Sequence, residues 1–212
     1  MHAKICMATN SISKFGFYSA VAAGCASIAF TIVQLLQVLS ITTYPIDAIL
    51  INTTSLCIAP PFLLAMLALH YTISTVNRFY THAAVLFATA YNVFVMYIYV
   101  VQLGAVLPYN ITNPVLIVTP HSLFWTVDAL GYINMGVAAL FAFAAFTYEN
   151  LGKWPKLWFL LHALVTPVIA LVYFYPTFST PLLMLGSVWS ITSVASMFSL
   201  ALWFKKSTAV MA

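Results

Sequence analysis

Six long apolar stretches run along the chain, separated by short segments that contain proline, asparagine and charged residues. The stretches cover residues 15–39, 49–71, 82–106, 123–146, 157–175 and 181–204. A transmembrane helix needs about 20 mainly apolar residues, and each stretch has this length or nearly so. The runs are continuously apolar and lack the alternation that is typical of a membrane β-strand. The pattern therefore predicts an all-α, polytopic membrane protein with six transmembrane helices in one bundle, which forms a single domain over 1–212.

The composition points the same way. Apolar residues make up 64% of the 212 residues, and charged residues make up only 5%. A soluble domain usually carries about 25% charged residues, so this chain has too few charges to cover a water-soluble surface. The composition excludes a soluble domain, a disordered chain and a nucleic-acid-binding protein, and it indicates that the main partner is the lipid bilayer.

The positive charges predict how the helices are oriented. All seven lysine and arginine residues fall on one side of a six-helix membrane protein, because they flank the stretches at alternate ends: Lys4, Lys14, Arg78, Lys153, Lys156, Lys205 and Lys206. Loops rich in lysine and arginine stay in the cytoplasm. We therefore expect both termini to be cytoplasmic, in an integral protein of a bacterial inner (plasma) membrane.

Asp128 is the one carboxylate within a predicted span. An acid at a helix centre costs about 2.5 to 3.5 kcal/mol on insertion scales, and intramembrane acids commonly mark functional sites. Gln34, Gln37 and Gln102 reach a similar depth from the first and third spans. We expect the Asp128 carboxylate to face the bundle interior, within hydrogen-bonding reach of one of these amides. The alternative is an interfacial aspartate that is bonded to water.

These polar positions suggest a cavity in the outer half of the bundle. The leading hypothesis is a protein that binds or transports a small lipophilic or amphipathic molecule there, with the site residues Asp128, Gln34, Gln37, Gln102, Trp189 and Tyr132. The chain lacks the HExxH, GxSxG and Walker motifs of common enzyme classes. We therefore favour a non-enzymatic function and expect no cofactor.

Three histidines support a different hypothesis. His70, His82 and His162 lie toward the predicted cytoplasmic side, and neutral imidazoles at a common depth can bind a metal or a haem. The alternative function is then a metal- or haem-dependent membrane redox enzyme. A further alternative is a structural subunit, either in a homo-oligomer or in a larger membrane complex.

Prolines occur near the middle of two spans. Pro60 and Pro61 fall in the second span, and Pro167 falls in the fifth. Proline removes a backbone hydrogen bond and kinks or breaks a helix. Paired breaks in two inverted halves would point to a binding site near the midplane, whereas isolated prolines are simply tolerated in membrane helices.

Overall fold

The structure is a computed structural model that describes residues 2–147 and 152–210, with side chains described for 10–147 and 152–207. It is all-helical, and the described residues contain no strand. The elements in chain order are α1 (His2–Val38), α2 (Ile46–Leu56), α3 (Ala59–Thr72), η1 (Thr75–Asn77), α4 (Arg78–Val101), η2 (Gln102–Val106), α5 (Leu123–Ala145), α6 (Lys153–Phe174), α7 (Thr180–Gly186) and α8 (Val188–Val210).

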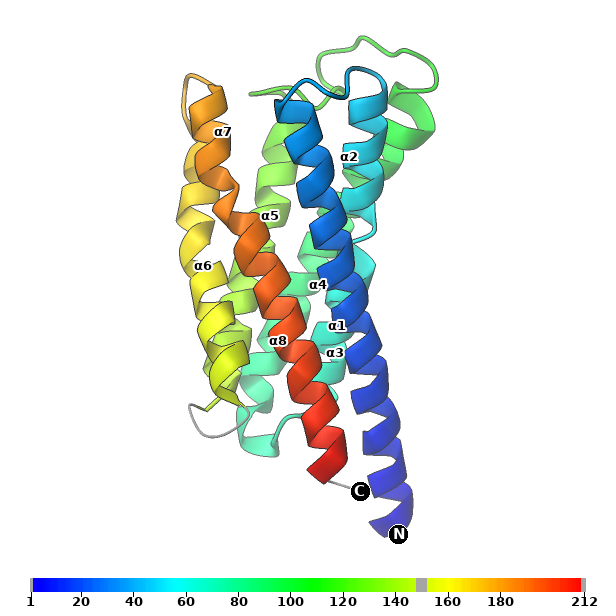
Figure 1. The fold of residues 1–212 in the computed structure, drawn as a ribbon, viewed down its shortest axis with the longest axis vertical. Helices are drawn as coiled ribbons and strands as arrows, with labels where there is room; N and C mark the ends of the chain where they lie inside the picture. Colours follow the sequence, from blue (N-terminus) through cyan, green and yellow to red (C-terminus); the bar gives the residue numbers. More distant parts are fainter. Residues whose placement is uncertain (1, 148–151, 211–212) are drawn as a thin grey trace.

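Six helical segments are long and apolar enough to cross a membrane, as the sequence predicted. Within the described residues they are Asn10–Val38, Ile46–Thr72, Thr75–Val106, Leu123–Ala145, Lys153–Phe174 and Thr180–Ser207. The segments run side by side in one bundle, and α1 begins at the same end at which α8 finishes (Figure 1). An even number of crossings places both ends of the chain on the same side of the bundle.

The helices form a closed ring in chain order. The long helix α1 packs against α3, which packs against α4, and the series continues through α5 and α6 to α8. The last helix, α8, then packs back against α1. The short helices α2 and α7 extend the second and sixth spans at one end of this ring (Figure 1). Because every long helix has two long neighbours, each contributes a stripe of buried side chains to a common interior.

Small residues let the helices approach closely in the middle of the ring. On α5, Ala138, Ala139 and Ala142 are fully buried. One turn earlier, Gly136 leaves just enough room for the Thr166 side chain of α6. Small side chains at helix contacts allow the close backbone packing that stabilises membrane bundles. The tight α5–α6 contact fixes these two helices against each other below the cavity described in the next subsection.

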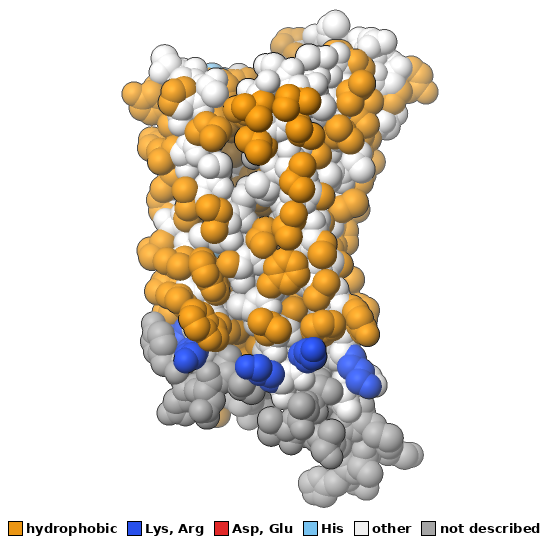
Figure 2. All heavy atoms as spheres, in the orientation of Figure 1, with side chains coloured by type: hydrophobic (Ala, Val, Ile, Leu, Met, Phe, Trp, Pro, Cys, Tyr) orange, Lys and Arg blue, Asp and Glu red, His pale blue; other side chains and the backbone are white. Residues whose placement is uncertain are grey.

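The charged side chains divide the bundle into two ends. Lysine and arginine side chains lie in one band where α1 begins and α8 finishes, and hydrophobic side chains cover the surface beyond it (Figure 2). The two carboxylates of the described residues lie elsewhere, Asp47 in the first turn of α2 and Asp128 in α5. We call the end with the lysines the lysine end and the other the opposite end.

Two spans, the second and the sixth, are interrupted. The second span is broken at Cys57–Ile58, between α2 and α3, directly before the two prolines. Helix α6 continues through Pro167, so the fifth span has no break that would pair with the one in the second span. The sixth span is broken at Ser187, between α7 and α8. Prolines are tolerated within membrane helices, and Pro167 lies inside α6 in this way.

The α5–α6 contact gives a first testable prediction. A methyl group at position 136 would overlap the Oγ1, Cβ and Cγ2 atoms of Thr166, and rotation of the threonine cannot move its own Cβ away. We expect Gly136→Ala to lower the free energy of unfolding by about 1–3 kcal/mol, the usual effect of overpacking, measured as thermal denaturation in detergent. The control is Gly104→Ala, since nothing lies within 4 Å of the added atom there. An unchanged melting temperature for Gly136→Ala would contradict the close packing.

Candidate functional site

A cavity of about 270 Å³ lies inside the ring at the opposite end. The helices α1, α2, α4, α5, α6 and α7 all contribute to its wall. A smaller chamber of about 60 Å³ adjoins it and shares several of its lining residues, among them Gln34, Tyr132 and Tyr173. Among the described residues that line either space there is no lysine, arginine or histidine. The cavity therefore combines one acid with uncharged polar and aromatic groups.

The Asp128 carboxylate lies at this cavity and is held by two tyrosines. The hydroxyl of Tyr99, on α4, donates to Oδ1 at 2.9 Å, and the hydroxyl of Tyr173, on α6, donates to Oδ2 at 2.6 Å. Asp128 is only 5% exposed, so it faces the interior as expected. Hydrogen bonds to a charged group contribute about 1.5–3 kcal/mol each. The two bonds offset part of the cost of burying the carboxylate, and they tie α4 and α6 to α5.

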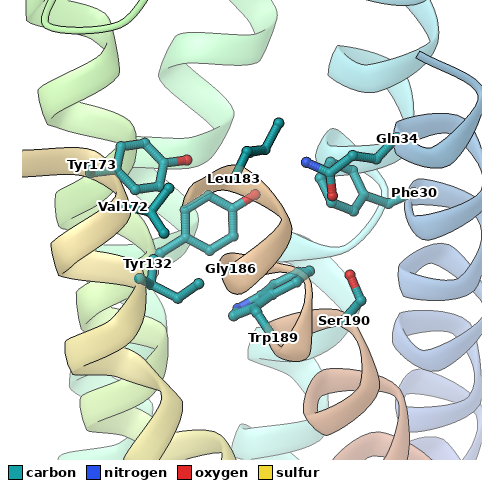
Figure 3. A pocket seen from close by; sticks show the side chains of 10 residues that line it. Phe30, Gln34, Tyr132, Val172, Tyr173, Leu183, Gly186, Trp189 and Ser190 are labelled. Carbon is teal, nitrogen blue, oxygen red and sulfur yellow. The ribbon is translucent and has the colours of Figure 1, made fainter. Parts of the chain in front are cut away.

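Tyr132 extends this cluster one helical turn along α5. Its hydroxyl oxygen lies 3.5 Å from that of Tyr99. Figure 3 shows the Tyr132 and Tyr173 hydroxyls pointing into the same space, with the Gln34 amide facing them from α1. Three tyrosine hydroxyls, one carboxylate and one amide therefore converge on the cavity from four helices.

Aromatic rings form the rest of the wall. The Trp125 indole packs on Tyr173 at a centroid distance of 4.5 Å and donates from Nε1 to the Tyr173 carbonyl oxygen at 3.0 Å. The Trp189 ring stands edge-on to Tyr132 at 5.0 Å and to Phe30 at 5.8 Å. These edge-to-face contacts are the preferred geometry of aromatic pairs. They hold the rings in place and leave the tyrosine hydroxyls free to aim at the carboxylate and the cavity.

The predicted site residues divide into two groups. Asp128, Gln34, Gln37 and Tyr132 line the larger space, and Trp189 lines the smaller one together with Gln34 and Tyr132. Gln102 does not line either space, because it opens the π-helical turn η2 and donates to the Leu116 carbonyl oxygen at 2.6 Å.

The expected amide partner of Asp128 is replaced by tyrosines. Gln37 donates instead to Oδ2 of Asp47 at 2.9 Å, and Gln102 is turned toward the loop before α5. Tyr99, Tyr173 and Trp125 also belong to the site, although the sequence did not single them out as parts of it. A tyrosine is common in membrane helices, so its presence gave no signal. The three-residue spacing that places Tyr99 and Gln102 on similar faces of α4 was the one available hint.

The three histidines do not form one site. His70 Nδ1 pairs with Thr81 Oγ1 at 3.0 Å, and the His82 ring lies 5.5 Å from the His70 ring. His162 is buried and pairs through Nδ1 with Thr192 Oγ1 at 2.9 Å. In the part of the chain that the structure describes, no three histidine, cysteine or acidic residues come together as a metal site would require. The arrangement therefore gives the redox hypothesis no common ligand set.

Comparisons of this chain with protein families, with curated proteins and with solved structures find no match. The interpretation of the site therefore depends on its own geometry.

The carboxylate cluster generates a stability prediction. Tyr99→Phe removes the donor to Asp128 Oδ1 and leaves that oxygen buried without it. We expect a loss of about 1.5–3 kcal/mol in unfolding free energy, the range for a hydrogen bond to a charged group, read from thermal denaturation in detergent. Tyr97→Phe is the matched control, on the same helix but 58% exposed. Equal melting temperatures for the two variants would show that the Tyr99 hydroxyl does not support the carboxylate.

Proposed function

We propose that the protein binds a small, partly apolar molecule in the cavity at the opposite end, and that this molecule carries a positively charged group. The observation that carries the proposal is the Asp128 carboxylate, which lies at a cavity lined by aromatic rings and free of basic residues in the described chain. A cation gains from a carboxylate and also from the face of an aromatic ring, by about 0.5 to 2 kcal/mol for each ring. An anionic group would be repelled by the Asp128 carboxylate and would find no basic side chain among the described lining residues.

The size of the cavity limits the ligand. Its volume of about 270 Å³ lies just below the range of about 300–1,000 Å³ that is usual for small-molecule sites. A compact ligand, such as an amine joined to a single ring or a short aliphatic chain, fits this space. The mixture of rings and few polar groups is the usual chemistry of such sites.

Trp189 provides a second polar contact for a ligand. Its side chain is 6% exposed, and its Nε1 has no hydrogen-bond partner among the residues that the structure describes. A buried donor without a partner costs about 1–3 kcal/mol. An acceptor on a molecule bound beside Trp189 would remove this cost, so we place the uncharged polar part of the ligand near this indole.

We further propose that the lysine end is cytoplasmic. The described lysine and arginine side chains are all at that end, and the positive-inside rule assigns such a band to the cytoplasm. The cavity then lies in the outer half of an integral protein of a bacterial inner (plasma) membrane. Its ligand would enter from the outer aqueous phase or from the outer leaflet.

Movement of the ligand across the membrane is a second candidate function, and one observation favours it. The two interrupted spans place their short helices, α2 and α7, in the cavity wall through Ala48, Ile51 and Leu183. Interrupted helices beside a binding site are typical of secondary transporters. A carrier would need these short helices to move relative to α3 and α8.

Ligand binding is tested with a charged probe and its neutral counterpart, 2-phenylethylamine and 2-phenylethanol. We expect the amine to stabilise the purified protein against heat and to bind about tenfold more weakly or worse to Asp128→Asn, a loss of about 1.4 kcal/mol or more. The Asn side chain keeps the size of the acid and retains one acceptor. Asp47→Asn is the control for loss of a carboxylate at the same end, since Asp47 itself does not line the cavity and is linked to it through its hydrogen bond from Gln37. If both probes bind equally to all three proteins, the carboxylate has no role in binding.

Orientation is tested with single cysteines in a background from which Cys6, Cys25 and Cys57 are removed. Ser74 lies in the loop before α4 at the lysine end, and Asn110 lies in the loop after η2 at the opposite end; both are exposed. We expect an impermeant thiol reagent to label the cysteine at position 110 in intact cells and to label the one at position 74 only after lysis. The reverse pattern would place the lysine end outside.

A further inference from the structure

A second recess lies at the lysine end, on the outside of the ring. It has a volume of about 650 Å³ and runs between the start of α6 and the end of α8. Its wall is apolar and rich in tryptophan, and its rim carries one lysine from each helix, Lys153 and Lys206. We call this recess the α6–α8 groove. It shares no lining residue with the cavity around Asp128.

The described charged residues that line the groove are of one sign. Lys153 and Lys206 are both exposed, and the Lys153 ammonium lies 5.5 Å from the centre of the Trp154 ring. Both carboxylates of the described chain, Asp47 and Asp128, are far along the bundle at the opposite end. The groove also contains the first turn of α6, where the helix dipole adds partial positive charge. The rim therefore favours an anionic group.

Below the rim, the groove changes from charged to apolar. On α8, Leu202 and Phe198 line the wall about one and two turns before Lys206, so the apolar wall extends about 12 Å from the lysine at 1.5 Å per residue. On α6, Trp158 lies about one and a half turns after Lys153 and continues the wall on the other side. This length corresponds to most of the hydrocarbon depth of one leaflet, which is about 15 Å for a core of about 30 Å.

We propose that the α6–α8 groove binds an anionic phospholipid of the leaflet at the lysine end. The lipid phosphate lies between Lys153 and Lys206, and one acyl chain lies along Trp158, Phe198 and Leu202. Free phosphate or a soluble anion would use the lysines but not the apolar wall, whereas a neutral phospholipid would use the wall but gain nothing from the lysines. Basic pockets between transmembrane helices on the cytoplasmic side are known to bind acidic lipid headgroups.

The three tryptophans of the groove allow a direct test. Lipids with brominated acyl chains quench tryptophan fluorescence on contact, and Trp154, Trp158 and Trp203 line the groove. The protein in mixed micelles is titrated with brominated phosphatidylglycerol and with brominated phosphatidylcholine of the same chain length. We expect stronger apparent binding of phosphatidylglycerol. The preference should fall by roughly 25-fold in Lys153→Gln/Lys206→Gln, since each interfacial lysine contributes about fivefold.

Two further double variants serve as controls for the titration. Lys14→Gln/Lys205→Gln removes two other exposed lysines at the same end, neither of which lines the groove, and should keep the preference. Lys153→Arg/Lys206→Arg keeps both charges and should also keep it, which separates lost binding from lost folding.

Four results would overturn the proposal. Equal quenching by both lipids in the unmodified protein would show that the groove does not select acidic headgroups. An equal loss in both glutamine pairs would indicate general attraction to the surface. Displacement of phosphatidylglycerol by millimolar inorganic phosphate would indicate an anion site without lipid. Loss of the preference in the arginine pair would exclude charge as its cause.

Discussion

The burial of the Asp128 carboxylate is the constraint on which the opposite end of the bundle depends. An ionised group inside a low-dielectric interior is strongly destabilising unless other groups compensate it. Here the compensation comes from two hydroxyls on two different helices, Tyr99 on α4 and Tyr173 on α6. Each bond has one favourable direction, so the pair fixes the rotation of both helices about their axes. The aromatic wall follows from that rotation, because Trp125 and Tyr132 are placed by the same contacts.

The two ends of the ring differ because the side chains that face its interior differ in size. Along the middle of α5 the buried positions are alanines and a glycine, which bring α5 and α6 close together. Toward the opposite end the same helix presents Asp128 and Tyr132. These larger side chains and their hydrogen-bond partners keep the helices farther apart around a polar space. The cavity therefore lies at the opposite end for a local reason, namely the order of small and large residues along α5.

The number of long apolar helices and the interior position of Asp128 could be predicted from the sequence, because both follow from length and hydropathy along the chain. The partners of Asp128 could not. Which residues contact Asp128 depends on how each helix is rotated about its axis. Continuously apolar helices show little hydrophobic periodicity from which this rotation could be predicted. Gln102 illustrates the point: one π-helical turn directs its amide toward Leu116. The break in the sixth span was missed for a different reason: Gly186 directly precedes Ser187, but glycine is frequent in membrane helices and does not by itself predict a break.

The chain-order ring has a consequence for how the protein assembles. Contacts between successive helices are local in sequence, and local contacts form early and fast. The exception is the seam between α1 and α8, where Ser27 and Ser193 hydroxyls lie 3.1 Å apart across 166 residues. During synthesis this seam stays open until the final helix has been inserted. The small-residue face of α1 that packs against α8 therefore stays uncovered until α8 has been inserted. In that interval this face is available to incorrect helix partners or to membrane-insertion chaperones.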